Sequence, residues 1–369
     1  YINFLAANFE AAMSDCPQSH EGWTLLADCA NGVGTLNFSR LRYKLENIIQ
    51  IKSVNTNLTN PSSLNHLCGS EYYSEASGES ARSLRSTFLP YLKRCPSRKA
   101  LFISVDGDAD RLICAGADER DDIVILNGDY IQALFVLFLQ RLLTEVSEIF
   151  PLTVVQTPYS NGNLTSFFHN QLGLPVQMVP PGVKHCHARS KESPIGVYFE
   201  PNGHGSVTFS QSVQKILEEK FRESSRRADR VFYRISKLYS QACGDAIANG
   251  LCVLIALSYC EMQVADWKRV FRRLPYATSQ IQLSRPLDIQ TNYLQNTIEY
   301  PCDIQEALEK IVEEARQEKT TQEDLSIRCF VRPSGTQPIL RLYVESTSAT
   351  ASAKVLYRLE CYFHNRLHE

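Results

Sequence analysis

The chain has 369 residues, and its 38 basic and 40 acidic side chains leave a formal net charge of −2. Apolar residues make up 44% of the sequence and charged residues 21%, the balance of a globular protein with a substantial core. The near-neutral charge argues against a nucleic acid or a membrane surface as the main partner, because both favour a strongly basic face.

The sequence shows no secretory signal and no run of about 18 uncharged apolar residues that could cross a bilayer. Its 12 cysteines are scattered and form no CxxC pair, a pattern that favours buried thiols in a reducing, cytoplasmic compartment over disulfides. The one dense cluster of soft ligands, residues 185–187 (HCH), lacks a second ligand cluster at zinc spacing, which argues against a zinc site.

The first predicted element is an amphipathic helix over residues 1–13, with apolar residues at helical spacing. Residues 23–41 predict a strand, a tight turn and a helix, with Gly32 and Gly34 supplying the turn. A GxG pair without a third glycine is a weak nucleotide signal, so we prefer a plain βα turn. Residues 60–99 are polar and lack periodicity, so we expect a long loop there.

The middle of the chain alternates strands and helices. A strand at 101–105 and a helix at 129–146 complete one α/β domain, residues 21–150. The pattern restarts after Pro151, with a strand at 153–157, a turn at 160–162, a helix to about 172, a strand at 195–200, and helices within 211–239 and 243–261. This predicts a second α/β domain, residues 151–274.

A last domain, residues 275–369, begins where Pro275 and Pro286 interrupt the pattern. Its predicted elements are a strand at 280–284, a helix at 303–319, strands at 326–331 and 339–346, and a final helix. The fold class predicted for the chain is therefore mixed α/β domains with a smaller C-terminal α+β domain.

Three aspartates end the predicted strand 101–105, in the segment DGDADR. In an extended segment Asp106, Asp108 and Asp110 would point the same way, and a divalent cation such as Mg²⁺ would remove their repulsion. An EF-hand loop is excluded because Arg111 and Ala117 stand where Gly and Glu are required. A solvated acidic turn remains an alternative, but Arg111 favours a phosphate that bridges arginine and metal.

A second motif, RPSGTQPILR, lies between two predicted strands and is flanked by Arg332 and Arg341. Its Ser334, Gly335 and Thr336 offer hydroxyls and backbone N–H groups that can surround an oxyanion. A simple hairpin turn would explain the proline and the glycine but not the two arginines, so we favour a phosphate site.

Two further loops carry polar groups. In YFEPNGHG, Glu200, Asn202 and His204 follow a predicted strand and suit sugar hydroxyls, although an ordinary Asn-Gly turn explains the segment equally well. In PGVKH, Lys184 and His185 follow a predicted turn, where they could contact a phosphate or move a proton, or could simply be solvated.

Metal ligands, a phosphate turn and hydroxyl-binding groups together indicate an enzyme that acts on sugar phosphates. Seven segments, in order along the chain, resemble the α-D-phosphohexomutase superfamily, and most closely its phosphoacetylglucosamine mutase branch. They are ADCANGVGTL (27–36), LNHLCGSEY (64–72), DGDADR (106–111), VVQTPYSNGN (154–163), GVKH (182–185), GVYFEPNGHG (196–205) and FVRPSGTQP (330–338). The FEPNGHG form of the sugar loop separates this branch from the glucose and mannose relatives.

The resemblance implies several domains around one cleft and the interconversion of hexose 6-phosphates and 1-phosphates through a bisphosphorylated sugar. In this branch the substrate is N-acetylglucosamine phosphate, and the product feeds UDP-N-acetylglucosamine synthesis. The implied roles are Mg²⁺ ligands at Asp106, Asp108 and Asp110, catalytic groups at Arg111 and Lys184, and substrate contacts at His185, Glu200, Pro201, Asn202, His204, Arg332, Pro333, Ser334, Gly335, Thr336 and Arg341.

The sequence departs from the superfamily in its first part. Superfamily members carry the phosphoryl group on a serine in a Thr-Ala-Ser-His-type loop, and the only Ser-His pair here, at 19–20, lacks the flanking pattern. We therefore expect residues 1–20 to be the tail of a missing first domain, in either a truncated fragment or a non-catalytic relative. Smaller departures are Asn127 and Gln337 in place of expected acids, Pro181 and Pro201 in two substrate loops, and the absence of a lysine after CGSEY.

Overall fold

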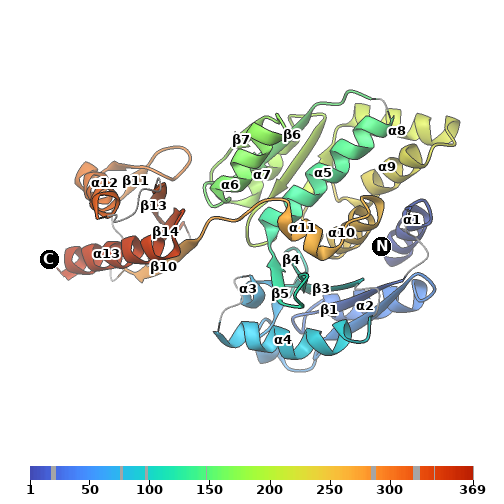
Figure 1. Ribbon diagram of the computed structural model, residues 1–369, viewed down its shortest axis with the longest axis horizontal. Helices are drawn as coiled ribbons and strands as arrows, with labels where there is room; N and C mark the ends of the chain where they lie inside the picture. Colours follow the sequence, from blue (N-terminus) through green and yellow to red (C-terminus); the bar gives the residue numbers. More distant parts are fainter. Residues whose placement is uncertain are drawn as a thin grey trace. The chain divides into compact units, whose positions relative to one another are not determined.

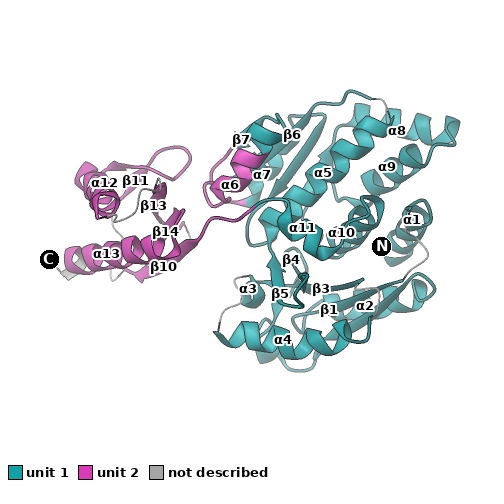
Figure 2. Cartoon of the chain, in the orientation of Figure 1, with its two compact units in different colours: residues 1–156, 168–177, 183–271 teal, residues 157–167, 178–182, 272–369 magenta. Residues whose placement is uncertain are grey.

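The computed structural model describes residues 1–17, 22–74, 78–95, 99–146, 148–283, 288–318, 325–335 and 337–368. Its contacts divide the chain into two compact units (Figure 2). Unit 1 comprises residues 1–156, 168–177 and 183–271, and unit 2 comprises residues 157–167, 178–182 and 272–369. None of the helices in the described ranges is long and apolar enough to cross a membrane.

Unit 1 contains a five-stranded sheet in the order β2-β1-β3-β4-β5 (Figure 1). Its strands are β1 (Trp23–Asp28), β2 (Ile49–Val54), β3 (Ala100–Val105), β4 (Leu112–Ala117) and β5 (Ile123–Leu126). The first three strands in chain order are parallel, and the last two extend the sheet in antiparallel fashion. The C-terminal ends of β1 and β3 therefore lie side by side at one edge, which positions the loop that follows β3.

The expected loop at 60–99 is wrong, because two helices form there: α3 (Gly69–Tyr73) and α4 (Gly78–Leu92). Leu84, Phe88 and Leu92 recur at helical spacing along α4. They pack against the sheet, where they meet Phe102 of β3 and Ile113 of β4. This apolar stripe is short and is surrounded by serines and arginines, so the segment reads as polar although one face of the helix is buried.

The turn after β1 also differs from expectation. Ala30 and Asn31, not the glycines, adopt positive φ angles of 51° and 56°. Gly32 is required for a different reason, because a Cβ atom there would lie 2.1 Å from the carbonyl oxygen of Gly107 in the aspartate loop. The two loops thus approach each other too closely for a side chain at this position.

A second sheet of unit 1 has the strand order β7-β6-β8-β9. Its strands are β6 (Leu152–Gln156), β7 (Val176–Met178), β8 (Ile195–Phe199) and β9 (Gly205–Phe209). The long helix α5 (Gly128–Val146; green in Figure 1) packs against β8 and against the apolar helix α10 (Ala246–Tyr259; gold in Figure 1). Other helices of unit 1 are α1 (Ile2–Ser14), α2 (Gly34–Lys44), α7 (Val183–Ser190), α8 (Gln211–Glu223), α9 (Arg227–Leu238) and α11 (Val264–Arg269).

Unit 2 contains a three-stranded antiparallel sheet in the order β10-β14-β13. Its elements are β10 (Tyr276–Gln282), β11 (Gln290–Thr291), β12 (Ile298–Tyr300), α12 (Cys302–Gln317), β13 (Ile327–Pro333), β14 (Ile339–Ser346), α13 (Ala349–His368) and the short helix α6 (Gly162–Ser166). Leu340, Leu342 and Val344 alternate along β14 toward a core shared with α12 and α13. The intervening side chains of β14 consequently lie on the opposite face of the sheet.

These elements confirm the predicted α/β class and most predicted segments, including the helices at 1–13, 129–146 and 303–319. Strands β2, β4, β5, β9, β11 and β12 were not predicted from the sequence. Strands β4 and β9 are almost entirely buried, so neither shows the alternation of polar and apolar residues that marks a half-buried strand.

Candidate functional site

The aspartate loop follows β3 and folds back on itself. The carboxylate of Asp106 accepts hydrogen bonds from the backbone N–H groups of Asp110 (3.0 Å) and Arg111 (3.1 Å). Ala109 has a φ of 59°, so the segment is a turn and not the extended chain assumed from the sequence. The three aspartates converge because the loop curls around the carboxylate of Asp106.

The charges of this loop fit a divalent cation. One oxygen from each of Asp106, Asp108 and Asp110 can be chosen so that all three lie within 4.8 Å of one another. Asp110 Oδ1 is buried and accepts no hydrogen bond from the described residues. Burial and the neighbouring Asp110 raise the pKa of Asp106, while the N–H of Arg111 opposes them. A set of closely spaced carboxylate oxygens suits Mg²⁺.

Arg111 is the cation that lies beside the carboxylates. Its Nε is 3.5 Å from Asp106 Oδ2 and 3.8 Å from Asp110 Oδ1. Its Nη1 lies 3.8 Å from Glu71 at the start of α3. These distances are longer than close ion pairs, so one guanidinium offsets the clustered negative charge only partly.

The predicted sugar loop, residues 200–204, lies directly against the aspartate loop. The N–H of Leu112 donates to the carbonyl of Gly203 (3.1 Å), and Arg111 and His204 form a backbone bridge. His204 Nδ1 lies 3.4 Å from Asp110 Oδ2. Gly203 has a φ of 90°, and a Cβ there would lie 2.0 Å from the Leu112 carbonyl oxygen, so only glycine allows this approach.

The sugar loop is a tight turn in its own right. The N–H of Gly203 donates to the carbonyl of Glu200 (2.9 Å), and Asn202 Oδ1 accepts from the N–H of His204 (3.0 Å). The Asn-Gly turn that was left open as an alternative is therefore present. The carbonyl of Pro201 accepts a hydrogen bond from the N–H of Gly128 (3.2 Å), the first residue of α5. The turn leaves Asn202 exposed and Glu200 half-buried beside the aspartate loop.

Asn127, which stands where an acid was expected, immediately precedes α5 and is 2% exposed. Its Oδ1 atom is buried and accepts no hydrogen bond from the described residues. The backbone of the next residue holds Pro201 of the sugar loop. Asn127 thus lies next to the residue that holds the sugar loop at Pro201.

Lys184 and His185 follow the turn predicted for this segment and lie on the first turn of α7. Lys184 is exposed and His185 is half-buried. Within the described ranges, neither side chain forms a hydrogen bond or an ion pair with the aspartate loop. The role of both residues stays a prediction.

The predicted phosphate turn belongs to unit 2 and joins β13 to β14. Arg332 and Arg341 are direct cross-strand partners, so their side chains share the face opposite the helices. Arg341 Nε is buried and makes no hydrogen bond with the described residues. Like charges at directly opposite positions destabilise a sheet, and a phosphate bound between them would remove that penalty.

The turn itself is closed by a hydrogen bond from the N–H of Ser334 to the carbonyl of Ile339 (2.9 Å). Pro333 is the last residue of β13, and a Cβ at Gly335 would meet nothing within 4 Å. Gln337 is exposed. Thr336 lies outside the described residues, as does the Ser-His pair at 19–20.

Sequence reasoning missed Asp28, which organises the edge of the sheet next to the aspartate loop. Its carboxylate is fully buried and accepts hydrogen bonds from Ser104 Oγ (2.6 Å), Asn55 Nδ2 (2.7 Å) and the N–H groups of Gly69 (2.7 Å) and Ala30 (3.1 Å). Burial raises the pKa of Asp28 above its ordinary value, and the hydrogen bonds from these four donors make that rise smaller. A buried strand that ends in an aspartate was the available signal.

Asp245 caps α10, whose first residue supports the aspartate loop through a hydrogen bond from the N–H of Ala246 to the carbonyl of Ala109 (2.9 Å). Asp245 Oδ1 accepts from the N–H of Ala248 (3.0 Å) and the hydroxyl of Tyr1 (2.9 Å). We expect Asp245→Ala to lower the free energy of unfolding by about 1–2 kcal/mol in urea denaturation. Asp245→Asn keeps an acceptor and should lose less; equal losses would contradict the capping role.

Two family profiles match the chain. They are described as "Phosphoacetylglucosamine mutase AMG1, domain III", over residues 127–262, and "Phosphoglucomutase/phosphomannomutase, C-terminal domain", over residues 303–359. The phosphoacetylglucosamine mutase of Candida albicans is 32% identical over 352 residues, which cover 94% of this chain and 61% of that protein. The Homo sapiens phosphoacetylglucosamine mutase is 32% identical over 329 residues, 88% of this chain and 56% of that protein. The chain thus spans about three fifths of the length of these relatives.

Solved structures show the same likeness. The crystal structure of an N-acetylglucosamine-phosphate mutase in its product complex superposes with a TM-score of 0.84 at 30% identity, covering 98% of this chain and 65% of that one. Aspergillus fumigatus N-acetylphosphoglucosamine mutase, in complex with GlcNAc-6P and magnesium, superposes with a TM-score of 0.80 at 28% identity. That match covers 97% of this chain and 68% of the other.

Proposed function

The chain is a homologue of the phosphoacetylglucosamine mutases and belongs to the α-D-phosphohexomutase superfamily, and we propose that it acts on N-acetylglucosamine phosphate. The proposed reaction interconverts the 6-phosphate and the 1-phosphate through a bisphosphorylated sugar. Its product would serve UDP-N-acetylglucosamine synthesis.

The observation that carries this proposal is the direct contact between the aspartate loop and the sugar loop. The hydrogen bond between Leu112 and Gly203 and the pair of His204 with Asp110 connect the proposed cation site to the proposed hydroxyl-binding turn. A sugar phosphate carries a phosphate, which can bind a cation, close to hydroxyl groups, which can bind such a turn. The A. fumigatus relative was crystallised with GlcNAc-6P and magnesium, which agrees with the same pair of ligands here.

In the proposed mechanism, Asp106, Asp108 and Asp110 hold Mg²⁺, which when bound supplies positive charge for the transferring phosphoryl group. Arg111 adds a second positive charge next to that position. Glu200, Asn202 and His204 orient the sugar, with Lys184 and His185 of α7 as further candidates for substrate contact. The phosphate turn binds the phosphate that does not react, so catalysis depends on positioning and electrostatics.

A non-catalytic sugar-phosphate-binding protein is the second candidate. The 369 residues given include the groups required for binding but no Thr-Ala-Ser-His-type loop, the segment that carries the phosphoryl group in the superfamily. Binding requires only the residues described above, whereas turnover also requires a phosphoryl carrier.

One experiment separates the two candidates. The chain is mixed with N-acetylglucosamine 6-phosphate, Mg²⁺ and a catalytic amount of N-acetylglucosamine 1,6-bisphosphate, and the 1-phosphate is followed by ³¹P NMR while calorimetry measures binding. Turnover that EDTA abolishes supports the mutase, and saturable binding without turnover supports the binding protein. A chain that neither binds nor converts the sugar phosphate would contradict both.

A further inference from the structure

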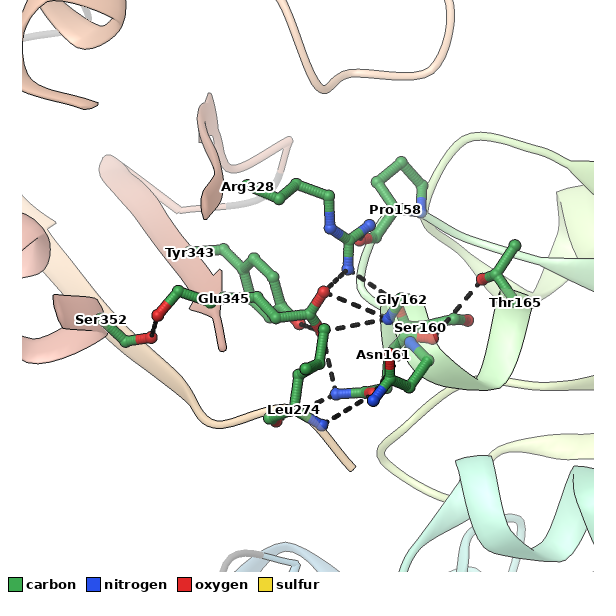
Figure 3. Close-up of polar contacts among 12 residues, drawn as sticks. Pro158, Ser160, Asn161, Gly162, Thr165, Leu274, Arg328, Tyr343, Glu345 and Ser352 are labelled. Carbon is green, nitrogen blue, oxygen red and sulfur yellow. Dashed lines mark hydrogen bonds and ion pairs between the residues drawn. The ribbon is translucent and has the colours of Figure 1, made fainter. Parts of the chain in front are cut away.

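In unit 2, the loop of residues 157–162 lies against the polar face of β13 and β14. The centre of this contact is Glu345 of β14, which is only 2% exposed. Its carboxylate accepts hydrogen bonds from Asn161 Nδ2 (2.9 Å), the N–H of Gly162 (3.1 Å) and the hydroxyl of Tyr343 (3.0 Å), as Figure 3 shows. The donors of Asn161 and Gly162 attach one end of the loop to the sheet.

Arg328 attaches the other end of the loop. Its guanidinium pairs with Glu345 (3.1 Å) and donates to the carbonyls of Pro158 (2.8 Å) and Ser160 (2.8 Å), which lie beside it in Figure 3. The positive charge of Arg328 is therefore neutralised by a carboxylate. The backbone on both sides of residue 159 is held in place.

Tyr159 lies between the two carbonyls that Arg328 binds. Its ring packs edge-on against Phe330 and Tyr343, with ring centroids 5.0 Å and 5.5 Å apart. Its hydroxyl accepts a hydrogen bond from Arg332 Nε (3.0 Å). Two aromatic neighbours and an anchored backbone thus fix the acceptor to which this arginine binds.

Gln295 supplies a second acceptor for Arg332, with Oε1 3.3 Å from Nη1. It lies in a turn closed by Asn292, whose side chain accepts from the N–H of Asn296 (3.0 Å) and whose carbonyl accepts from the N–H of Gln295 (3.0 Å). Gln295 adopts a φ of 58°, an unusual conformation for a non-glycine residue that this turn maintains. Both side-chain acceptors of Arg332 are therefore electrically neutral.

The two arginines of β13 differ in a way that matters for anion binding. Arg328 and Arg332 lie on the same face of the strand, four residues apart. Arg328 pairs with a carboxylate, whereas the side-chain partners of Arg332 are a phenol and an amide. Neutral acceptors fix the direction of a guanidinium and leave its full charge for a phosphate.

We propose that Tyr159 and Gln295 are positioning residues of the phosphate turn. They orient the guanidinium of Arg332 without neutralising its charge. The inference rests on the proposed function, because it takes the group between Arg332 and Arg341 to be the phosphate of a sugar phosphate. Tyr159 and Gln295 act through Arg332 and need not touch the ligand.

The test is the dissociation constant for N-acetylglucosamine 6-phosphate, measured by calorimetry on the full chain at constant ionic strength. We expect Tyr159→Phe, which removes only the acceptor, to weaken binding about threefold to tenfold. Gln295→Met, which keeps the size but not the acceptor, should have a similar effect. Gln295→Glu keeps the acceptor but adds a negative charge, and we expect it to weaken binding by more than about tenfold.

The Glu variant separates positioning from simple structural support. A structural role alone predicts that Gln295→Glu binds as well as the wild type, because its contact with Arg332 is preserved. The thermal midpoints of all three variants should stay close to that of the wild type. Tyr357→Phe, at a residue 66% exposed on α13, is the matched control and should bind normally.

A double-mutant cycle completes the test. In an Arg332→Met background, Tyr159→Phe should cause no further loss, since the guanidinium that it orients is gone. Additive losses, or normal binding by both Tyr159→Phe and Gln295→Glu, would overturn the inference alone. A wild-type chain that does not bind the sugar phosphate would refute the proposed function and the inference together.

Discussion

Replacing Asp108 by asparagine is expected to weaken Mg²⁺ binding by at least about tenfold, because it removes one of three charged ligands. The same change should slightly stabilise the metal-free protein, by about 0.5 kcal/mol, because it relieves repulsion between Asp108 and its two neighbours. Asp108 is the exposed member of the set, so its side chain can be changed without disturbing the core. Calorimetric titration with Mg²⁺ and urea denaturation in EDTA measure the two effects.

The opposite signs of these effects make the prediction specific. A solvated acidic turn would show the gain in stability but bind Mg²⁺ no better than the variant does. Glu10→Gln, at an exposed position on α1, removes the same charge away from the cluster and should change neither quantity measurably. Equal Mg²⁺ affinities for the wild type and Asp108→Asn would contradict the proposed metal site.

Replacing Glu345 by glutamine should destabilise unit 2 by about 2–4 kcal/mol. The carboxylate accepts from three donors and pairs with Arg328, and an amide of the same shape would turn an N–H₂ group toward some of them. Because Arg328 is partly exposed, part of the lost pairing is compensated by water, which keeps the estimate below that for a fully buried pair.

Hydrogen exchange measured by mass spectrometry localises this effect. Peptides that cover residues 157–167 and 339–346 should exchange faster in Glu345→Gln, whereas peptides from the five-stranded sheet of unit 1 serve as the internal reference. Glu306→Gln, at an exposed position on α12, is the matched charge control. Unchanged exchange at 157–167 would show that Glu345 does not hold this loop.

The aspartate loop shows how a prediction of proximity can be confirmed although its reason is incomplete. Asp106, Asp108 and Asp110 were identified from like charges at alternate positions after a strand, and the structure brings them together. The extended geometry used in that argument is wrong, because the carboxylate of Asp106 accepts hydrogen bonds from two backbone N–H groups and the loop folds around it. Charge density is a local property of the sequence, whereas the path of a loop depends on hydrogen bonds that no pattern of residue types specifies.

Residues 60–99 show the limit of local patterns. Helix α4 was missed because only one narrow face is apolar. In this segment the neighbouring sheet decides the outcome, since burial of a few side chains such as Phe88 stabilises a helix that isolated propensity does not favour.

The sequence by itself determined which residue types are available for chemistry: the clustered acids, the arginines that flank a turn, and the elements that carry them. Tertiary structure alone decided which of these groups act together. Tyr159 lies 173 positions from Arg332 along the chain, and Glu345 lies 184 positions from Asn161. Strand pairing and close packing bring such residues together, and periodicity or charge along a single segment contains no information about partners so far apart.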